Sequence, residues 1–306
     1  MKQLQILIYL FVATTVFAQT PTDGLMMGKG LNCSVLSYGK STWEYYWEGS
    51  LYRNNENIGK FTGQNVMFMN NYGISNRLNV IVGVPYIWTQ ASNGNLAGHR
   101  DVQDFSAWLK YKALDLKVGE NKFAGFVTVG ASVPTHHYKN EMLPFAVGMG
   151  AKTASVRAAL HFKTKIGFYV TGQAGYTLKG DATLDRDSYQ YDGKVYPTNV
   201  VPVPDVADMT GRIGFLNKRV QVEGFYDYFT CVSGDNIRRQ DMPFMTNKMM
   251  ATSIGAMAKV NWYTSVGMFT LAGQYSRILS GRNVGDATMR SIAIQYTIRL
   301  KKVDQK

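Results

Sequence analysis

The chain has 306 residues and a formal net charge of +12 at pH 7, with 45% hydrophobic and 18% charged residues. This composition excludes an intrinsically disordered chain, and the length allows one large domain or two ordinary ones. Excess positive charge on an exported chain suits an anionic surface, such as phosphorylated lipid, better than a nucleic acid, for which the sequence has no motif.

Residues 1–18 have the parts of a secretory signal peptide. Lys2 supplies the positive end, an apolar run follows, and Val16-Phe17-Ala18 fits a small-residue cleavage site. A membrane anchor is the alternative, but the apolar run falls short of about 18 residues. No later apolar run is long enough for a transmembrane helix, so a membrane protein built from this chain must be a closed barrel.

Residues 19–40 contain four glycines and one proline and no sustained period, which predicts an irregular N-terminal segment. Alternation begins at Thr42, so a first strand is expected over 42–51, and the rest of the chain, 41–306, is expected to form the barrel. The clearest strand runs from Asn76 to Gln90. One parity of that strand is mostly apolar and ends in aromatic residues, which are Leu78, Val80, Val82, Val84, Tyr86 and Trp88.

The same alternation recurs along the chain and predicts 12 strands in all. Residues 144–163 change parity midway and are interpreted as one long bent strand, with two short strands as the alternative. The remaining strands are expected at about 60–74, 104–112, 122–133, 166–179, 207–216, 219–231, 248–262, 266–279 and 290–301.

The connections between these strands alternate between short turns and long loops, which is typical of outer-membrane barrels. Aromatic residues are also expected near both rims, where amphipathic rings suit the membrane interface. They are Trp43, Tyr111, Phe123, Phe168 and Trp262 on the short-turn side, and Trp88, Tyr176, Tyr226, Tyr228 and Tyr275 on the long-loop side. A secreted β-sandwich is the alternative. The pattern favours an all-β, transmembrane, antiparallel up-and-down β-barrel of outer-membrane type, located in the outer membrane of a Gram-negative bacterium.

The sequence offers little for catalysis or metal binding. Adjacent residues of an extended chain point in opposite directions, so His136 and His137 cannot both serve one metal ion. No G-x-S-x-G motif is present. The aspartates of loop 180–206 do not have the spacing of an EF-hand, which favours a solvated loop. We therefore expect no enzyme activity, no metal and no cofactor, although a triad assembled from distant strands stays open.

The inward-facing parity carries charges of both signs, which predicts the lining of a lumen or solute pathway. Twelve tilted strands give a backbone radius of about 12 Å, which leaves room for a passage or an inserted plug. The predicted lining residues are Glu44, Glu48, Lys110, Gln173, Lys179, Arg212, Glu223, Asp227, Lys259 and Arg299.

We expect residues 19–40 to enter this lumen in part and limit its permeability, and a segment lying free in the periplasm is the alternative. If the segment enters, Cys33 can approach Cys231 and form a disulfide. Two unpaired thiols are the simpler expectation for cysteines so far apart in the sequence.

Several stretches resemble the outer-membrane protein family associated with the MetA pathway of phenol meta-degradation. The resemblance rests on Tyr72-Gly73-Ile74-Ser75-Asn76-Arg77-Leu78-Asn79-Val80, Val84-Pro85-Tyr86, Asp104-Phe105-Ser106-Ala107-Trp108-Leu109-Lys110-Tyr111, Ser132-Val133-Pro134-Thr135 and Gly175-Tyr176-Thr177-Leu178-Lys179-Gly180. It covers roughly residues 60–300. The glycine-rich stretch that the family has before its fourth strand is replaced by His99-Arg100-Asp101-Val102-Gln103, and His136-His137 stands where a Gly is common.

The resemblance implies a transporter-like channel that takes up a small, often hydrophobic solute without covalent chemistry, and it does not identify the solute. The alternative is a structural or surface-binding barrel that acts through its long extracellular loops and transports nothing. The expected partners are outer-membrane lipid and a small-molecule solute, with no nucleic acid. Oligomeric state does not follow from the sequence.

Overall fold

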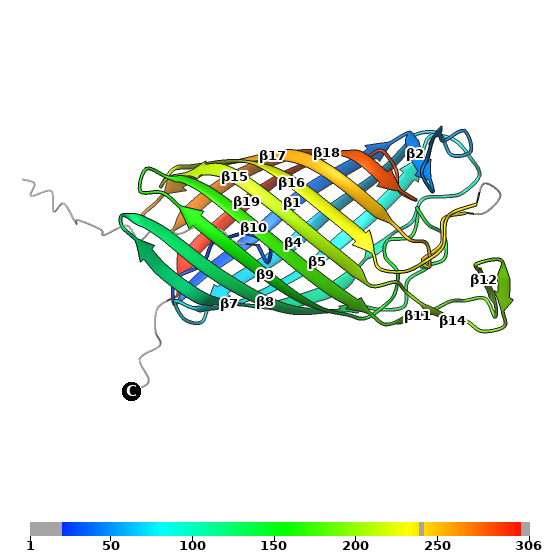
Figure 1. The fold of residues 1–306 in the computed structure, drawn as a ribbon, viewed down its shortest axis with the longest axis horizontal. Coiled ribbons are helices and arrows are strands. Elements are labelled where there is room, and N and C mark those ends of the chain that lie inside the picture. The colour runs from blue at the N-terminus through cyan, green and yellow to red at the C-terminus, as the bar shows by residue number, and fades with distance from the viewer. Residues whose placement is uncertain (1–19, 239–241, 301–306) are drawn as a thin grey trace, which may run out of the picture.

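The computed structural model describes residues 20–238 and 242–300 as a closed antiparallel β-barrel of 12 strands (Figure 1). The signal-peptide prediction for residues 1–18 lies outside the described residues. The barrel strands are β1 (Leu31–Trp43), β4 (Phe61–Gly73), β5 (Leu78–Ala91), β7 (Asp104–Val118), β8 (Asn121–Pro134), β9 (Thr153–Lys163), β10 (Phe168–Lys179), β15 (Val206–Leu216), β16 (Val220–Cys231), β17 (Met250–Tyr263), β18 (Met268–Arg282) and β19 (Thr288–Arg299).

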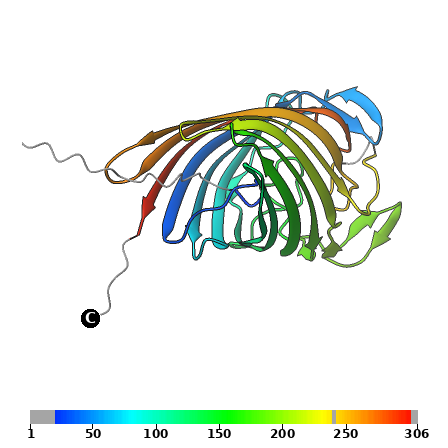
Figure 2. The ribbon, with the colours of Figure 1, turned by 60° about the vertical axis from the view of Figure 1, so that its left-hand side comes forward.

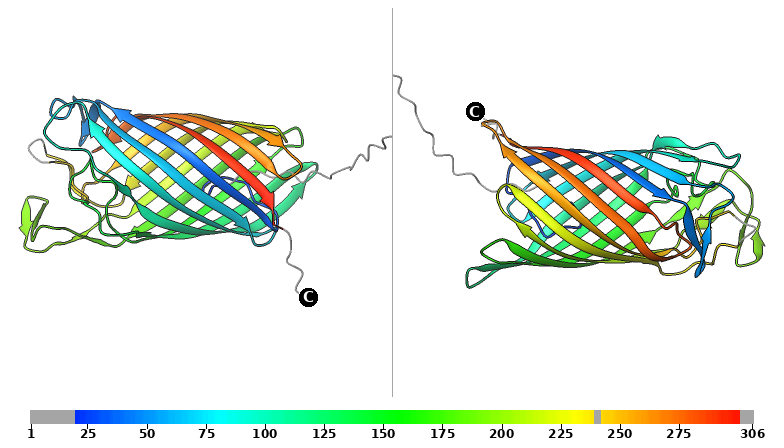
Figure 3. Two further views of the ribbon diagram at one scale, coloured as in Figure 1. Left: turned by 180° about the vertical axis from the view of Figure 1, so that it is seen from behind. Right: turned by 90° about the horizontal axis from the view of Figure 1, so that it is seen from above.

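The barrel closes because β1 pairs with both β4 and β19, so its sheet has no free edge between first and last strand. This closure excludes the sandwich alternative and confirms the predicted fold. Short turns gather at one end, while the long loops and several small strands gather at the other (Figures 1 and 3). In the described parts of the chain, no helix is long and apolar enough to cross a membrane.

The distribution of apolar side chains is the reverse of that in a soluble protein. Large aliphatic side chains face outward around the barrel and are highly exposed, among them Ile213 (66%), Ile294 (60%) and Leu160 (54%). In β5 the predicted parity is confirmed, because Asn79 and Ile81 point inward and are fully buried while Val82 lies on the outer face. An apolar outer surface and a polar interior are what a surrounding lipid requires.

The predicted first strand is wrong. Residues 31–40, expected to be irregular, belong to β1, and the residues after β1 form a hairpin of β2 (Tyr45–Glu48) and β3 (Leu51–Asn54) at the long-loop end. The inward side of β1 begins with the apolar residues Leu31, Cys33 and Val35, which pack against Met27 of the preceding chain, so the strand lacks the contrast between a polar and an apolar face that marks the others. The hairpin is held by the stacked rings of Tyr45 and Tyr52, whose centroids lie 5.5 Å apart.

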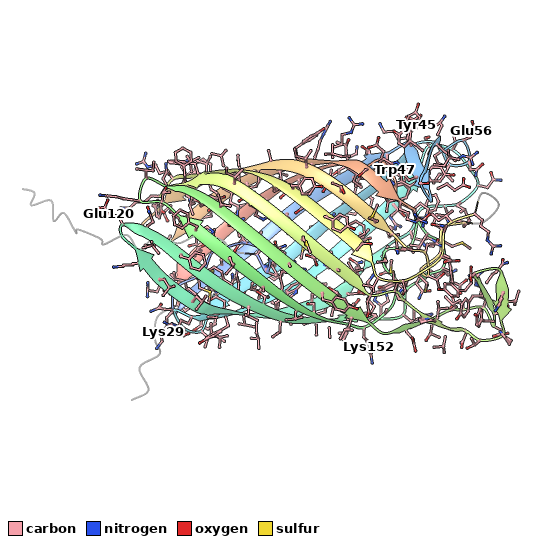
Figure 4. The ribbon with its side chains drawn as sticks, viewed as in Figure 1. Lys29, Tyr45, Trp47, Glu56, Glu120 and Lys152 are labelled. Carbon is pink, nitrogen blue, oxygen red and sulfur yellow. The ribbon has the colours of Figure 1, made fainter. Side chains whose placement is uncertain are left out.

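This shift corrects three further predictions. Glu44 follows β1, and Glu48 lies in the hairpin, where it pairs with Arg53 at 2.7 Å, so neither residue lines the lumen. Trp43 lies at the long-loop end of β1 and not on the short-turn side; its ring stacks on Phe61 with centroids 5.2 Å apart. Figure 4 shows Tyr45 and Trp47 at one end of the barrel and Glu120 at the other.

The predicted strand over 144–163 is half right. Only 153–163 forms a strand, β9, so the count of 12 holds and the two-strand alternative is wrong. Residues 144–152 fold into the mouth of the barrel. Phe145 is fully buried there, 5.7 Å from the ring of Phe61, and its carbonyl accepts a hydrogen bond from Thr89 Oγ1 at 2.8 Å. In the sequence, apolar residues that are buried against the rim cannot be distinguished from the apolar residues of a lipid-facing strand, so 144–152 were assigned to the strand.

Candidate solute pathway

The start of the described chain lies inside the barrel. Residues 20–28, here called the N-terminal segment, run through the short-turn half of the lumen before the chain enters β1 (Figures 2 and 3). Of residues 19–40, which were expected to enter the lumen in part, the structure places 20–28 inside, and their effect on permeability stays a prediction. The later part belongs to the barrel wall.

Lys110 of β7 holds this segment in place. Its ammonium donates to Thr20 O at 3.0 Å, to Asp23 O at 2.6 Å and to Asp23 Oδ1 at 2.7 Å. The side chains of Lys110 and Asp23 are only 1% and 9% exposed. The Lys110 ammonium also lies 5.2 Å from the centre of the Phe126 ring. A buried ion pair stays intact only when its remaining hydrogen-bonding groups are satisfied, and here two backbone carbonyls meet that need.

Apolar contacts complete the docking. Leu25 packs on Tyr169 and Leu216, and Met26 packs against a buried cluster that includes Phe126. Met27 is 1% exposed and packs with residues at the base of the barrel, which are Leu31, Cys33 and Met268. The segment therefore buries hydrophobic side chains inside a lumen whose wall is otherwise polar.

Two glycines let the chain pass so close to the wall. A Cβ on Gly24 would lie 2.3 Å from Nδ1 of His161, so no larger residue fits there without a shift. Gly30 has a φ of +75°, which lets the chain turn from the lumen into β1, and its amide donates to Gly73 O at 2.8 Å. Lys29, at this turn, lies at the short-turn end of the molecule (Figure 4).

Beside the segment, Glu223 of β16 organises a second polar group. Its carboxylate accepts hydrogen bonds from Arg212 at 2.6 Å, from Gln221 at 3.2 Å, and from the hydroxyl of Tyr169. The Glu223 side chain is 3% exposed. Charge-assisted hydrogen bonds of this kind fix side-chain positions, so this wall is rigid where it faces the segment.

A luminal cavity of about 300 Å³ separates the N-terminal segment from the opposite wall. It is bordered by Thr20, Thr22 and Asp23 on one side, and by residues of β1, β4 and β15–β19 on the others. Both signs of charge face it, because Arg212, Glu223 and Lys259 contribute to its lining. The lumen is therefore narrowed by the segment and still contains open space.

The long-loop end has a different character. A cavity of about 220 Å³ lies there between the rim and the loops. Its lining is mainly apolar and includes Trp43, Tyr46, Leu143, Pro144, Met149, Ile237, Pro243, Phe244, Met249 and Val284. An apolar cavity of about 150 Å³ can hold a benzene molecule, so this one has room for a single-ring compound.

The loops around this cavity have a core of their own. Their buried cluster comprises Ala151, Ala182, Leu184, Tyr189, Val201, Val203 and Met245. Short strand pairs shape the longest loop. They are β11 (Asp181–Thr183) with β14 (Val200–Pro202) and β12 (Tyr189–Tyr191) with β13 (Lys194–Tyr196).

The loop residue Tyr138 is tied to the start of β7. Its hydroxyl donates to Asp104 Oδ1 at 2.5 Å, and burial together with this hydrogen bond raises the pKa of Tyr138.

The two adjacent histidines do not meet at one site. His136 pairs with Asp101 at 3.0 Å and His137 with Asp185 at 2.9 Å, and both side chains are largely exposed. Within residues 20–238 and 242–300, no three His, Cys, Asp or Glu side chains gather as a metal site.

Most of the predicted lining residues lie on the inward face. Lys110, Gln173, Glu223 and Lys259 are buried there, and Arg212 and Asp227 share that side. Arg299 lies at the short-turn rim, where it donates to Lys29 O at 3.4 Å. Their role in a solute pathway stays a prediction.

Three residues that complete the luminal site belong to no pattern in the sequence. These are Asp23, His161 and Tyr169. Asp23 lies in a stretch without a period, so no pattern along the chain indicated that it would face the lumen.

The predicted approach of the cysteines is wrong. Cys33 is in β1 near the short-turn end, opposite Thr297, whereas Cys231 ends β16 beside the long loops. Both thiols are free and buried. Because Cys33 belongs to the wall and not to the inserted segment, it cannot cross the lumen toward Cys231.

No protein-family model matches the sequence, and no curated protein matches it. Among solved structures, the chain is similar to the COG4313 outer membrane channel from Pseudomonas putida F1, with a TM-score of 0.65 and 16% identity over 92% of this chain and 100% of that chain. Lower TM-scores are found for the translocator domain of the autotransporter NalP from Neisseria meningitidis (0.45, 11% identity, 89% of each chain). The CymD monoaromatic hydrocarbon channel scores 0.40, with 10% identity over 90% of this chain and 89% of that chain. At these identities the likeness to the COG4313 channel is one of fold: a transmembrane β-barrel of outer-membrane type.

Proposed function

We propose that this protein is an outer-membrane channel for a small hydrophobic solute, and that its N-terminal segment controls passage through the lumen. The observation that carries the proposal is the docking of residues 20–28 inside the barrel through Lys110 and Asp23. A barrel with a purely structural role has no need of a removable element in its lumen. The mechanism involves no covalent chemistry.

The arrangement of cavities supports a hydrophobic solute. In this proposal, the apolar cavity of about 220 Å³ near Trp43 and Phe244 binds the solute first, at the long-loop end. The polar cavity of about 300 Å³ near Glu223 lies further along the lumen. A solute that leaves the first cavity meets the second and the N-terminal segment, whose displacement would open the way to the periplasm.

Two further points support localisation in the outer membrane. The outward face is apolar around the barrel, and the fold is that of a protein described as an outer membrane channel. The sequence resemblance to the MetA-pathway family of phenol degradation agrees with a transporter-like channel, and membership of that family is part of the proposal.

Conductance tests the role of the segment. Full-length protein and a variant lacking residues 20–27 are reconstituted in planar bilayers, with a deletion of the exposed loop residues 94–97 as a control. We expect larger or more frequent open events for the first deletion and wild-type currents for the control. Gel migration of unheated samples shows that each barrel has folded. Equal currents for all three proteins would contradict the gating role.

Uptake of labelled toluene tests the apolar cavity. Met149→Trp fills the cavity near Pro144 and should lower the uptake rate of cells that carry the protein. Met142→Trp is a matched control, because Met142 is 40% exposed and borders a different, charged pocket. Equal uptake by the two variants would show that the solute does not pass this cavity.

The alternative is a barrel that binds partners at the cell surface and transports nothing. The independent apolar core of the loops around Tyr189 favours it. The two functions separate clearly, because a surface-binding barrel would lose its activity when hairpin 189–196 is deleted and would show no toluene uptake with any variant.

A further inference from the structure

Two cations face each other on the outer surface of the barrel. Lys40 of β1 and Arg290 of β19 are directly opposite in the register, and both are exposed. They share the outward parity of Leu36, Tyr38 and Ile292. Directly opposed residues on one sheet face have Cβ atoms about 4.5–5.5 Å apart, and like charges in such a pair destabilise the sheet. An anion bound between the two side chains would relieve this repulsion.

The protein does not provide that anion in the described residues. Lys40 is opposed on its other side by Gln64, and Arg290 by Tyr275, over whose ring the guanidinium lies at 5.9 Å. No ion pair within residues 20–238 and 242–300 includes Lys40 or Arg290. The neighbouring outward cation, Arg277, has its own acid, since it pairs with Asp286 at 3.3 Å.

Aromatic residues beside the pair indicate that it lies at the depth of lipid headgroups. Tyr38 lies two residues before Lys40 on the same face, and its ring is 6.2 Å from that of Trp88. Trp88 in turn lies 5.9 Å from Tyr86. These outward rings form part of the aromatic band on the long-loop side, which marks the interface between hydrocarbon and headgroups.

A groove on the lipid-facing wall ends at the same arginine. The groove, of about 650 Å³, is bordered by Tyr275 and Arg290 at one end. Its floor consists of small residues that are paired across neighbouring strands, Gly224 with Ala256 and Ala258 with Gly273. The atoms nearest to a Cβ added at Gly224 or Gly273 would be backbone oxygens at 3.9 and 4.0 Å, so the floor is open.

We propose that this surface binds a phosphorylated lipid of the outer leaflet. A phosphate bridges Lys40 and Arg290, and an acyl chain lies in the groove over Ala258 and Gly273. Arginine suits this role because its planar fork matches a phosphate with two parallel hydrogen bonds, and lysine adds a compact charge. The groove by itself would fit any apolar chain, but the unpaired cations at its end select a lipid with an anionic headgroup.

Native mass spectrometry of the full-length protein in detergent micelles tests the phosphate contact. The probes are diphosphorylated lipid A and the same lipid without phosphates. We expect the wild type to retain lipid A, and the double variant Lys40→Gln/Arg290→Gln to retain it at least tenfold less. The phosphate-free lipid should bind both proteins at that lower level. Lys117→Gln/Lys122→Gln removes two cations that are directly opposed and exposed on β7 and β8, so it is the charge-matched control and should bind like the wild type.

A second pair of variants tests the groove. Gly273→Leu fills its floor and should lower lipid A retention severalfold, whereas Gly172→Leu should not, because Gly172 is equally open but lies on another part of the wall, in β10. Unheated gel migration reports folding of every variant, and conductance should match that of the wild type throughout.

Three results would overturn the proposal. The first is equal lipid A retention by the wild type and the double variant. The second is full displacement of lipid A by millimolar inorganic phosphate, which would mean that the two cations bind a free anion and that the groove binds no acyl chain. The third is a dimeric mass for the wild type that Gly273→Leu converts to a monomer, which would make the groove an interface between two copies of this chain.

Discussion

Replacing Lys110 with methionine should release the N-terminal segment from the lumen. Methionine keeps an apolar stem but removes the ammonium that donates three hydrogen bonds to Thr20 and Asp23, at 2.6 to 3.0 Å. The docked segment would then carry a carboxylate that is only 9% exposed and has lost its nearest cation. In the undocked state the same carboxylate is hydrated, so the substitution acts on the docking equilibrium and hardly on the barrel.

The size of the effect follows from the burial of the pair. Removing one partner of a buried ion pair costs about 3–5 kcal/mol. Lys259 also attracts the charge of Asp23, so we take the lower end of that range. A loss of about 3 kcal/mol changes the ratio of docked to undocked segment by roughly 100-fold. Neutralising the stranded carboxylate with Asp23→Asn in the same protein should restore part of the docking, because a buried amide costs less than a buried charge.

Single-channel recording measures this directly. We expect the open fraction of Lys110→Met to approach that of the protein lacking residues 20–27. Lys112→Met is the control, because Lys112 lies two residues away on the same strand and its ion pair with Asp115 is partly exposed, worth at most about 1 kcal/mol. If Lys110→Met conducts like the wild type while the deletion conducts more, the anchoring role assigned to Lys110 is wrong.

Three further predictions concern the fold. Val82→Arg, on the outer face, should cost about 2–4 kcal/mol when unfolding is measured in lipid vesicles, and Ser291→Arg, which borders the luminal cavity, clearly less; equal costs would mean the faces are reversed. External protease on intact cells should cut within 189–194, in the outermost hairpin, and protection there would contradict the topology. Mass spectrometry without reductant should find Cys33 and Cys231 unlinked, whereas a cross-linked peptide pair would refute their placement at opposite ends.

A strand could be predicted from the sequence where its two faces differ strongly in polarity. Residues 78–91 place aliphatic and aromatic side chains on the lipid-facing side and polar ones inside. This alternation with a period of two can be recognised in the sequence because it does not depend on the details of packing. β1 was missed because Leu31, Cys33 and Val35 are apolar on the inward face, where polar residues are expected. Residues 144–152 were wrongly assigned to a strand, because the apolar Phe145 is buried against the rim of the barrel and does not belong to a lipid-facing strand.

The sequence by itself determined the fold class, the number of strands, the faces of most of them and the inward position of Lys110. These follow from local alternation, which lipid on one side and a polar lumen on the other impose residue by residue. Only the tertiary structure decided that Asp23 meets Lys110, 87 residues away, and that Cys33 and Cys231 stay apart. Contacts across a lumen join residues that have no fixed spacing in the chain, so no period records them.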